Sequence, residues 1–318
     1  MPSGYIALIV ISCVLAAVLI GAFVTLFLFV RSYLKPEKRS DEDLIVHEKD
    51  VKKFSDEWLK EEYVPVWTES RFGYRLKGYF YDFGFAETVV CLHGHNASHI
   101  SQLKYMELFK KLGYNAFLPD HRYSGSSGGK YITFGAKEKI DAADAINNLK
   151  TLRPDVKIAG LFGESMGAAT AMLLAPEIPD LGFLIEYCGY ANFEGLLSGF
   201  LKNKTFRKLG VALIGMVTKA FYGFSPKECD AAEALTKTRC PLLILHSRAD
   251  QVVAFENALI LKGVRPDAET VYFDDSLHAR SLCVYPAEFE SGVKRILDKY
   301  EMSEKAAAEA TAAAEGGR

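Results

Sequence analysis

The first strong pattern in the chain is an unbroken apolar run near its start. Residues 5–30, YIALIVISCVLAAVLIGAFVTLFLFV, contain no charged side chain. Such a run exceeds the roughly 20 residues that cross the hydrocarbon core of a bilayer. A cleavable signal peptide has a basic start and an apolar stretch of only roughly 7–15 residues, whereas MPSG before this run has no basic residue. We therefore predict a retained transmembrane helix over residues 5–30.

Beyond residue 63, short apolar runs alternate with segments of helical periodicity. The predicted strands are residues 78–83, 88–92, 115–119, 157–162, 182–187, 241–246 and 270–273. The predicted helices between and after them include residues 101–113, 136–150, 166–175 and 286–300. Several of the strands are too uniformly apolar to have one face in water. This alternation predicts an α/β domain over residues 63–300, with a mostly parallel, doubly wound sheet.

Three segments depart from the alternation. Residues from about 190 to 235 show only helical patterns, which predicts a helical cap inserted over the strand ends, where open α/β sheets hold ligands. Residues 31–62 are dense in charges of both signs with scattered apolar positions, which indicates a partly helical juxtamembrane stalk. Residues 301–318 are rich in Ala and Glu and predict a frayed helix or a disordered tail.

Charge and cysteine content bear on location. The formal net charge of −2 gives no reason to expect nucleic acid as a partner. No basic residue precedes the apolar run, and four follow it: Arg31, Lys35, Lys38 and Arg39. Because basic residues that flank a span favour the cytoplasmic side, this asymmetry predicts that the main domain lies in the cytoplasm. The six cysteines show no paired spacing and are typical of free thiols in a reducing compartment. We predict a single-pass protein of the cell membrane with its main domain in the cytoplasm.

A candidate nucleophile comes from the pattern G-x-S-x-G, which occurs twice. Residues 163–167, GESMG, follow a predicted strand and open a predicted helix, whereas residues 125–129, GSSGG, have no helix at their serine. A sharp strand-to-helix turn needs small flanking residues, and it projects the central hydroxyl at a helix N-terminus that stabilises negative charge. Ser165 is therefore the predicted nucleophile.

A serine hydroxyl needs a base to remove its proton, and that base needs an orienting carboxylate. Asp250 follows the strand 241–246, and His278 follows the strand 270–273. Both residues thus lie past strand ends, where Ser165 also lies. We predict Asp250 as the acid and His278 as the base, with Asp274 and Asp275 as weaker candidates for the acid.

The histidine-rich stretch CLHGHNASH, residues 91–99, follows another predicted strand. Acyl transfer needs two backbone N–H donors for the developing oxyanion, and Met166 and His95 fit these positions. His93 would brace the loop, and His99 would start a helix. A binuclear metal loop would read H-x-H-x-D-H, but its last two positions are Ala97 and Ser98. The sequence therefore predicts neither a metal nor a cofactor.

These residues resemble the α/β-hydrolase superfamily of serine hydrolases over residues 63–300. The resemblance rests on LHGHNAS, DHRYSGSSGG, GESMG, HSRAD and DSLH, in the order of the family. It is strongest to bacterial single-span hydrolases related to esterases and serine aminopeptidase-like proteins. It implies an α/β-hydrolase fold and a loop-bracing role for Asp120 and Arg122. His95 stands where many lipases and esterases carry glycine.

The predicted function is a membrane-anchored serine hydrolase that cleaves small-molecule esters of hydrophobic or aromatic acids. Possible pocket walls from the cap are Phe193, Leu196, Leu197, Phe200, Leu213, Ile214, Met216, Val217, Phe221 and Tyr222. An amide or peptide substrate with a free amine is the nearest alternative, and it would use an acidic cap residue such as Glu194 or Glu228. A non-catalytic membrane scaffold that keeps the fold is the alternative from another class.

Overall fold

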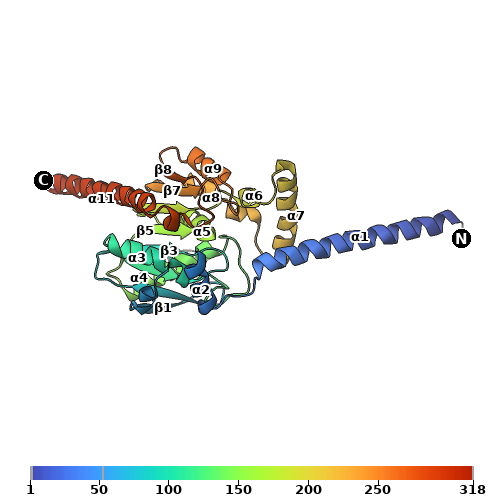
Figure 1. Ribbon diagram of the computed structural model, residues 1–318, viewed down its shortest axis with the longest axis horizontal. Coiled ribbons are helices and arrows are strands. Elements are labelled where there is room, and N and C mark those ends of the chain that lie inside the picture. Colours follow the sequence, from blue (N-terminus) through green and yellow to red (C-terminus); the bar gives the residue numbers. More distant parts are fainter. Residues whose placement is uncertain (1–2, 52–53, 317–318) are drawn as a thin grey trace.

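An eight-stranded sheet forms the centre of the protein in the computed structural model, which describes residues 3–51 and 54–316 (Figure 1). The strands are β1 (Val64–Glu69), β2 (Arg75–Tyr81), β3 (Glu87–Leu92), β4 (Asn115–Pro119), β5 (Lys157–Glu164), β6 (Phe183–Tyr187), β7 (Leu242–Ser247) and β8 (Glu269–Phe273). Their order is β1-β2-β4-β3-β5-β6-β7-β8. Strand β2 is antiparallel to both neighbours and all other pairs are parallel. The predicted mostly parallel sheet is confirmed.

Strand β1 is the one strand that the apolar pattern did not predict. It lies at the edge of the sheet and pairs only with β2. Of its six residues only Val66 and Thr68 are buried, so it lacks the apolar run that marks the central strands. It also contains Pro65, which an edge strand tolerates because one side of it needs no ladder hydrogen bonds.

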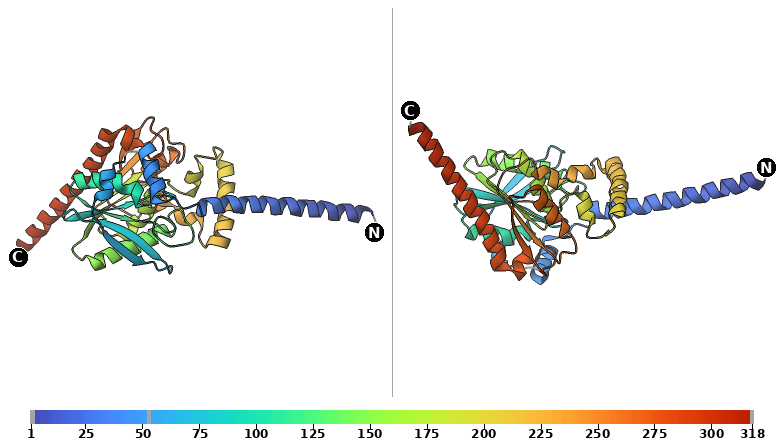
Figure 2. Two further views of the ribbon diagram at one scale, coloured as in Figure 1. Left: turned by 60° about the horizontal axis from the view of Figure 1, so that its bottom comes forward. Right: turned by 90° about the horizontal axis from the view of Figure 1, so that it is seen from above.

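Helices cover both faces of the sheet (Figure 2). One face packs against α3 (Leu103–Lys111) and α11 (Pro286–Gly316), and the other against α4 (Glu138–Leu152), α5 (Met166–Leu174), α8 (Ala231–Leu235) and α9 (Glu256–Val264). The shorter helices near the sheet are η2 (His99–Gln102), η3 (Ala175–Glu177) and α10 (Ser281–Val284). Each face has its own buried apolar cluster, so the sheet is the middle of three layers.

The strand order reverses between β3 and β5. From β3 the chain passes to β4 on one side, while β5 lies on the other side of β3. Loops that follow two such strands diverge and leave a crevice at the carboxyl ends of the strands, which is where open α/β sheets bind ligands. The loop after β3 carries the histidine-rich stretch, and the turn after β5 carries Ser165.

Helix α1 (Ser3–Leu34) has two parts with different surroundings. Its most apolar 18-residue window is 0% buried, and the helix projects away from the domain (Figure 1). At its other end Val30 and Leu34 are buried in a core cluster, and the Ile132 N–H donates to the Leu34 carbonyl at 2.8 Å. By length and composition α1 is long enough to cross a membrane, a property that signal sequences share.

The segment between α1 and β1 packs against the α/β domain. It contains α2 (Asp41–Val51) and η1 (Asp56–Lys60), and residues 52–53 of the predicted stalk lie outside the described residues. Leu44 is 2% exposed, and Glu48 forms a buried ion pair of 2.7 Å with Lys104 of α3. This segment therefore packs on the surface of the α/β domain. A stalk that only linked the domain to the membrane would not make these contacts.

The predicted cap contains α6 (Phe193–Leu197), α7 (Lys204–Tyr222) and η4 (Pro226–Cys229). Helix α7 stands apart from the sheet and contacts α1 (Figure 1). Helix α8, which also falls in the predicted range 190–235, packs instead against α5 and α9 as part of the main domain. At the C-terminus α11 continues as a helix to Gly316, and residues 317–318 of the predicted tail lie outside the described residues.

Candidate active site

Ser165 occupies a strained turn between β5 and α5. Its backbone has φ 57° and ψ −117°, a combination that non-glycine residues rarely adopt. A Cβ on Gly163 would lie 2.3 Å from the Gly167 carbonyl oxygen, and a Cβ on Gly167 would lie 2.0 Å from the Leu92 carbonyl oxygen. Both positions therefore require glycine, which explains why the G-x-S-x-G pattern marks this turn.

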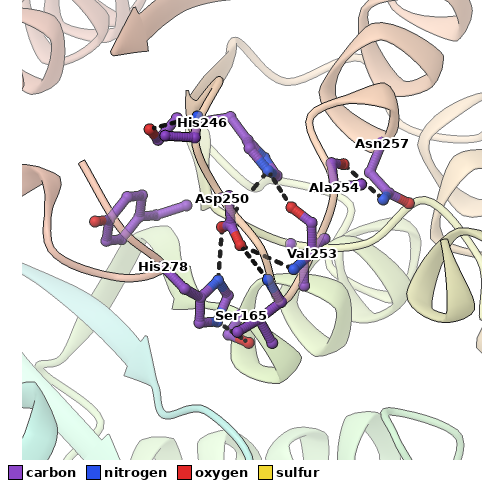
Figure 3. Close-up of polar contacts among 12 residues, drawn as sticks. Ser165, His246, Asp250, Val253, Ala254, Asn257 and His278 are labelled. Carbon is purple, nitrogen blue, oxygen red and sulfur yellow. Dashed lines mark hydrogen bonds and ion pairs between the residues drawn. The ribbon is translucent and has the colours of Figure 1, made fainter. Parts of the chain in front are cut away.

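Three of the predicted residues meet at the carboxyl ends of the strands (Figure 3). His278 Nε2 lies 2.9 Å from Ser165 Oγ, and His278 Nδ1 lies 2.6 Å from Asp250 Oδ2. Asp250 follows β7 and His278 follows β8, so the three side chains converge from three strand ends. The structure brings these predicted residues into one hydrogen-bonded chain.

Asp250 is fixed by the backbone of its own loop. Its Oδ1 accepts hydrogen bonds from the N–H groups of Val252 at 2.8 Å and Val253 at 2.9 Å. These bonds favour an ionised carboxylate, which accepts and does not donate. The Nδ1–H of His278 therefore donates to Asp250, and its Nε2 is left to accept the Ser165 hydroxyl proton. This is the tautomer that a general base needs.

The weaker candidates lie elsewhere. Asp274 is exposed and pairs with Arg248 at 3.4 Å, and Asp275 accepts a hydrogen bond from the Tyr285 hydroxyl. Ser127, the central serine of the second G-x-S-x-G match, lies in the loop after β4, where its hydroxyl donates to the Asp120 carbonyl at 2.7 Å. None of these contacts involves His278.

The loop after β3 passes beside Ser165. A Cβ on Gly94 would lie 3.5 Å from Ser165 Cβ. His95 and Met166 line the same cavity as Ser165, and Met166 begins α5, where the first N–H groups have no partner within the helix. The N–H groups of His95 and Met166 stay the predicted oxyanion donors, and both residues border the cavity that Ser165 borders.

His93 holds that loop in place from beneath. Its Nε2 accepts the His121 N–H at 2.9 Å, and its Nδ1 donates to the Gly94 carbonyl at 2.7 Å. Burial lowers the pKa of both His93 and His121, so both rings are neutral at pH 7. His93 therefore links the loop after β3 to the end of β4.

The remaining two histidines of the stretch point to different partners. His95 Nε2 lies 2.7 Å from the Tyr33 carbonyl of α1, and its ring stacks on Phe134. His99 stacks on Tyr79 and lies with its Nδ1 3.3 Å from Asp120. The imidazoles of His93, His95 and His99 therefore make three separate sets of contacts.

Asp120 and Arg122 hold the loop after β4. Asp120 accepts hydrogen bonds from the N–H groups of His99 and Ser126. Arg122 donates to the Tyr131 carbonyl at 3.0 Å and stacks over three aromatic rings. Both side chains are buried, and they connect this loop to its neighbours.

The sequence analysis did not predict a buried polar network next to the turn at Ser165. Glu164 precedes the nucleophile and accepts a 2.5 Å hydrogen bond from the Tyr105 hydroxyl. Lys104 lies 3.5 Å from Glu164 and 2.7 Å from Glu48 of α2. The charged segment after α1 thus reaches the residue next to Ser165, and the charge pattern of that segment gave no sign of it.

Cys188 and Glu186 are two further buried residues that the sequence analysis did not select. Ligand atoms of Cys188, Asp250 and His278 lie within 4.8 Å of one another, but both ring nitrogens of His278 are already engaged by Asp250 and Ser165. Burial raises the pKa of Glu186 to about 8, so its carboxyl is protonated at pH 7. Cys91, Cys229 and Cys240 are buried free thiols, and Cys13 is an exposed one.

Ser165 lies at the junction of two cavities of different character. One has a volume of about 420 Å³ and an almost entirely apolar lining, which includes Phe134, Tyr190 and Val253. The other, of about 460 Å³, has a mixed lining that includes Arg39, Gln251 and Arg280, together with His278. Both volumes fall within the range of ligand pockets, about 300–1,000 Å³.

The cap and α1 together wall the apolar cavity. The predicted cap residues that line it are Phe193, Leu196, Leu197, Phe200, Leu213 and Ile214. Met216 is exposed, Val217 and Tyr222 are buried in the core cluster, and Phe221 packs against Phe27 of α1. The sequence analysis missed the contribution of α1, which supplies Leu26, Phe29, Val30, Tyr33 and Leu34.

Comparison with known proteins agrees with this architecture. A family model described as the alpha/beta hydrolase fold matches residues 87–181. The uncharacterized protein YqkD of Bacillus subtilis (strain 168) is 30% identical over 295 residues, which cover 88% of this chain and 95% of YqkD. The chain therefore belongs to the α/β-hydrolase family.

Solved structures extend the comparison. The esterase Pf2001 of Pyrococcus furiosus is similar with a TM-score of 0.62 and 26% identity, over 78% of this chain and 95% of the esterase. An acylaminoacyl peptidase of Pyrococcus horikoshii is similar with a TM-score of 0.55 and 18% identity, over 80% of this chain and 42% of the peptidase. At this identity the peptidase shares the fold alone.

Proposed function

We propose that this protein is a serine hydrolase that cleaves carboxylic esters of hydrophobic acids at a membrane. The observation that carries the proposal is the chain of hydrogen bonds from Ser165 Oγ through His278 to Asp250, at 2.9 and 2.6 Å, beside an apolar cavity. Each distance is within the range expected of a nucleophile and its base. The esterase Pf2001 supports the ester class as a similar structure.

In the proposed mechanism, His278 Nε2 takes the Ser165 hydroxyl proton as Oγ attacks the ester carbonyl carbon. The resulting oxyanion accepts hydrogen bonds from the N–H groups of Met166 and His95, which are worth about 3–4 kcal/mol each in such sites. His278 then gives its proton to the departing alcohol, which leaves an acyl group on Ser165. Water, deprotonated by the same ring, releases the acid and restores the serine.

Asp250 orients and stabilises the ring of His278 throughout these steps. The carboxylate is held by two backbone N–H groups and is itself 7% exposed. A buried carboxylate with these partners keeps its charge and stabilises the imidazolium that forms during the reaction.

The alternative of a free-amine amide or peptide substrate lacks the acidic cap residue that it was expected to use. The two acidic residues that do line a cavity beside Ser165, Glu48 and Glu164, both pair with Lys104. Glu194 lies near Arg207 and lines a separate depression, and Glu228 caps η4 by accepting from the Ser225 N–H. Neither lines the two cavities beside Ser165. The arrangement thus favours an ester with an apolar acyl group over an aminoacyl substrate.

We further propose that α1 is a retained single-pass membrane anchor with the catalytic domain on the cytoplasmic side. Its exposed apolar window would be costly in water. Removal of α1 would also remove one wall of the apolar cavity and the contact between His95 and Tyr33. Because cleavage of α1 would open this cavity, the arrangement favours a retained helix over a cleaved signal sequence. The basic residues that follow the span support the cytoplasmic orientation.

The test of catalysis is labelling of the full-length protein in detergent with a fluorophosphonate probe. Wild type is expected to be labelled, with the adduct on the peptide that contains Ser165. Ser165→Ala should remove the label, and Ser127→Ala, at the central serine of the other G-x-S-x-G match, should retain it. An unlabelled wild type, or equal labelling of Ser165→Ala, would contradict the proposal and favour the non-catalytic scaffold.

A further inference from the structure

The helix that can cross the bilayer is also part of the cavity above Ser165. The last third of α1 lines the apolar cavity through Leu26, Phe29 and Val30, and through Tyr33 and Leu34. Val30 is 4% exposed and Leu34 is 1% exposed, whereas most large apolar side chains nearer the N-terminus are more than 40% exposed. One continuous helix thus leads from the membrane-spanning segment to the wall of the cavity.

Helix α7 forms the opposite wall and runs across α1 in all three views (Figures 1 and 2). Phe221 of α7 lies with its ring 5.1 Å from that of Phe27 and 6.2 Å from that of Phe23. When α1 stands along the bilayer normal, α7 therefore lies close to the plane of the membrane surface. This is the orientation of interfacial amphipathic helices.

The outer surface of α7 has the side chains that such a position requires. Phe206, Leu209 and Met216 are 62%, 53% and 61% exposed. Their spacing of three and seven residues places them on one side of the helix. At about 100° per residue, Lys208 and Lys219 flank this apolar side, about 60–100° around the helix from Leu209 and Met216. An apolar side toward the bilayer and a basic side toward headgroups and water is typical of a helix at the lipid surface.

The two cavities match the two ends of an amphiphile. The apolar cavity lies between α1 and α7, and the cavity with the mixed lining, which includes Arg39 and Arg280, also borders Ser165. An ester bond placed at Ser165 Oγ would have its acyl chain in the first and its alcohol part in the second. Because α1 and α7 both border the apolar cavity, an acyl chain would reach it from the lipid side.

We infer that the substrate is a long-chain lipid ester taken directly from the bilayer that holds α1, with its acyl chain entering the apolar cavity between α1 and α7. This inference rests on the proposed ester hydrolase and adds the substrate class and its source. The partner of the exposed side of α7 is the membrane surface itself.

The first test uses full-length protein reconstituted in phosphatidylcholine vesicles that contain a long-chain monoacylglycerol. If the substrate comes from the surrounding bilayer, the rate follows the mole fraction of the ester in the vesicle. Tenfold dilution of the vesicles at constant composition then leaves the rate per enzyme unchanged. A rate that falls in proportion to the bulk ester concentration, or a kcat/KM for this ester that is no higher than that for p-nitrophenyl acetate, would overturn the inference.

Two pairs of variants locate the path. Leu213→Trp fills the apolar cavity and should lower the ratio of long-chain to short-chain kcat/KM at least tenfold, whereas Val18→Trp, exposed in the span, should not change that ratio. Leu209→Glu with Met216→Glu should slow hydrolysis of the bilayer ester at least fivefold, whereas the matched pair Leu152→Glu with Leu259→Glu, equally exposed elsewhere, should not.

Fluorophosphonate labelling and hydrolysis of p-nitrophenyl acetate in detergent are measured for every variant. If wild type shows neither labelling nor hydrolysis of p-nitrophenyl acetate, the proposed function is contradicted. If wild type shows both but does not prefer the bilayer ester, only the inference is contradicted. An unchanged bilayer rate in Leu209→Glu with Met216→Glu would contradict a membrane contact at α7. If this variant hydrolyses the bilayer ester more slowly and also loses dimers that chemical cross-linking detects in wild type, that side of α7 contacts a second copy of the chain. This result would also overturn the inference.

Discussion

The two sides of Ser165 are built from different parts of the chain and by different forces. On the sheet side, Asp250 and His278 follow strand ends and are held by hydrogen bonds of 2.6 to 2.9 Å. On the other side, α1 and α7 supply apolar walls. Hydrogen bonds fix the geometry that proton transfer needs, whereas apolar packing tolerates changes that conserve volume. The reaction should therefore depend on the sheet side, and the choice of substrate on the helical side.

The largest change in activity is expected on the sheet side, at Asp250. Asp250→Asn keeps the shape of the side chain but removes the charge that orients the His278 Nδ1–H, and the analogous change in a serine protease triad lowers kcat about 10⁴-fold. We expect a loss of that order in kcat for p-nitrophenyl acetate, with substrate binding little changed. Asp274→Asn is the matched control, because Asp274 is exposed and pairs with Arg248. A similar loss in both variants would contradict the assignment of Asp250.

A second prediction concerns the buried carboxyl of Glu186 on the sheet side. Burial raises its pKa from the ordinary value of 4.5 to about 8, and it lies near Asp250. A raised pKa in the folded state means that this group's contribution to stability is fully present below about pH 4.5 and is lost as the pH rises to about 8. Its protonated form therefore stabilises the fold in acid.

Glu186→Gln removes this titration while it keeps an oxygen that can accept the Gly189 N–H. The free energy of unfolding, from urea denaturation, should fall between pH 5 and pH 8 in wild type by a few kcal/mol more than in the variant. The rest of β6 and the Gly189 N–H that follows this strand are unchanged, so the difference reports the carboxyl alone. Equal pH dependence of the two proteins would show that Glu186 is ionised throughout.

The smallest effect tests the link between the two sides. His95 belongs to the loop after β3, and its Nε2–H donates to the Tyr33 carbonyl at the end of α1. Burial lowers the pKa of His95, so this ring is neutral at pH 7. His95→Ala removes a hydrogen bond worth about 0.5–1.5 kcal/mol and should lower kcat by up to about tenfold.

His95→Gln restores a donor and should recover part of the activity of His95→Ala. Each rate is measured with a short and a long ester in detergent. Because we propose that this loop binds the oxyanion of either ester, the loss should be similar for both esters. A loss confined to the long ester would instead assign His95 to the wall of the apolar cavity.

The sequence predicted the sheet side well because its geometry depends on rare local patterns. The strained turn at Ser165 demands glycine at 163 and 167, since a Cβ at either position would collide with backbone. The central strands are buried on both faces and therefore appear as continuous apolar runs. The edge strand β1 has no such run, and its residues were not predicted as a strand.

The helical side was harder to predict because its contacts leave no periodic signal. The run over residues 5–30 is uniformly apolar, so the sequence cannot distinguish the part exposed on α1 from the part that lines the cavity. The contact of Glu48 with Lys104 joins residues far apart in the sequence and lies within a segment whose charges suggest exposure. The predicted cap range of 190–235 also included α8, because a helical pattern does not show which element a helix packs against; in the structure α8 packs on α5.

The central claim is that Ser165 carries the acyl group during turnover. The most direct measurement is peptide mass spectrometry of the full-length protein, acid-quenched within milliseconds of mixing with p-nitrophenyl dodecanoate. We predict a mass increase equal to the dodecanoyl group on the peptide that contains Ser165, and none in Ser165→Ala. Steady hydrolysis with no adduct on Ser165, or with the adduct on another residue, would contradict the account.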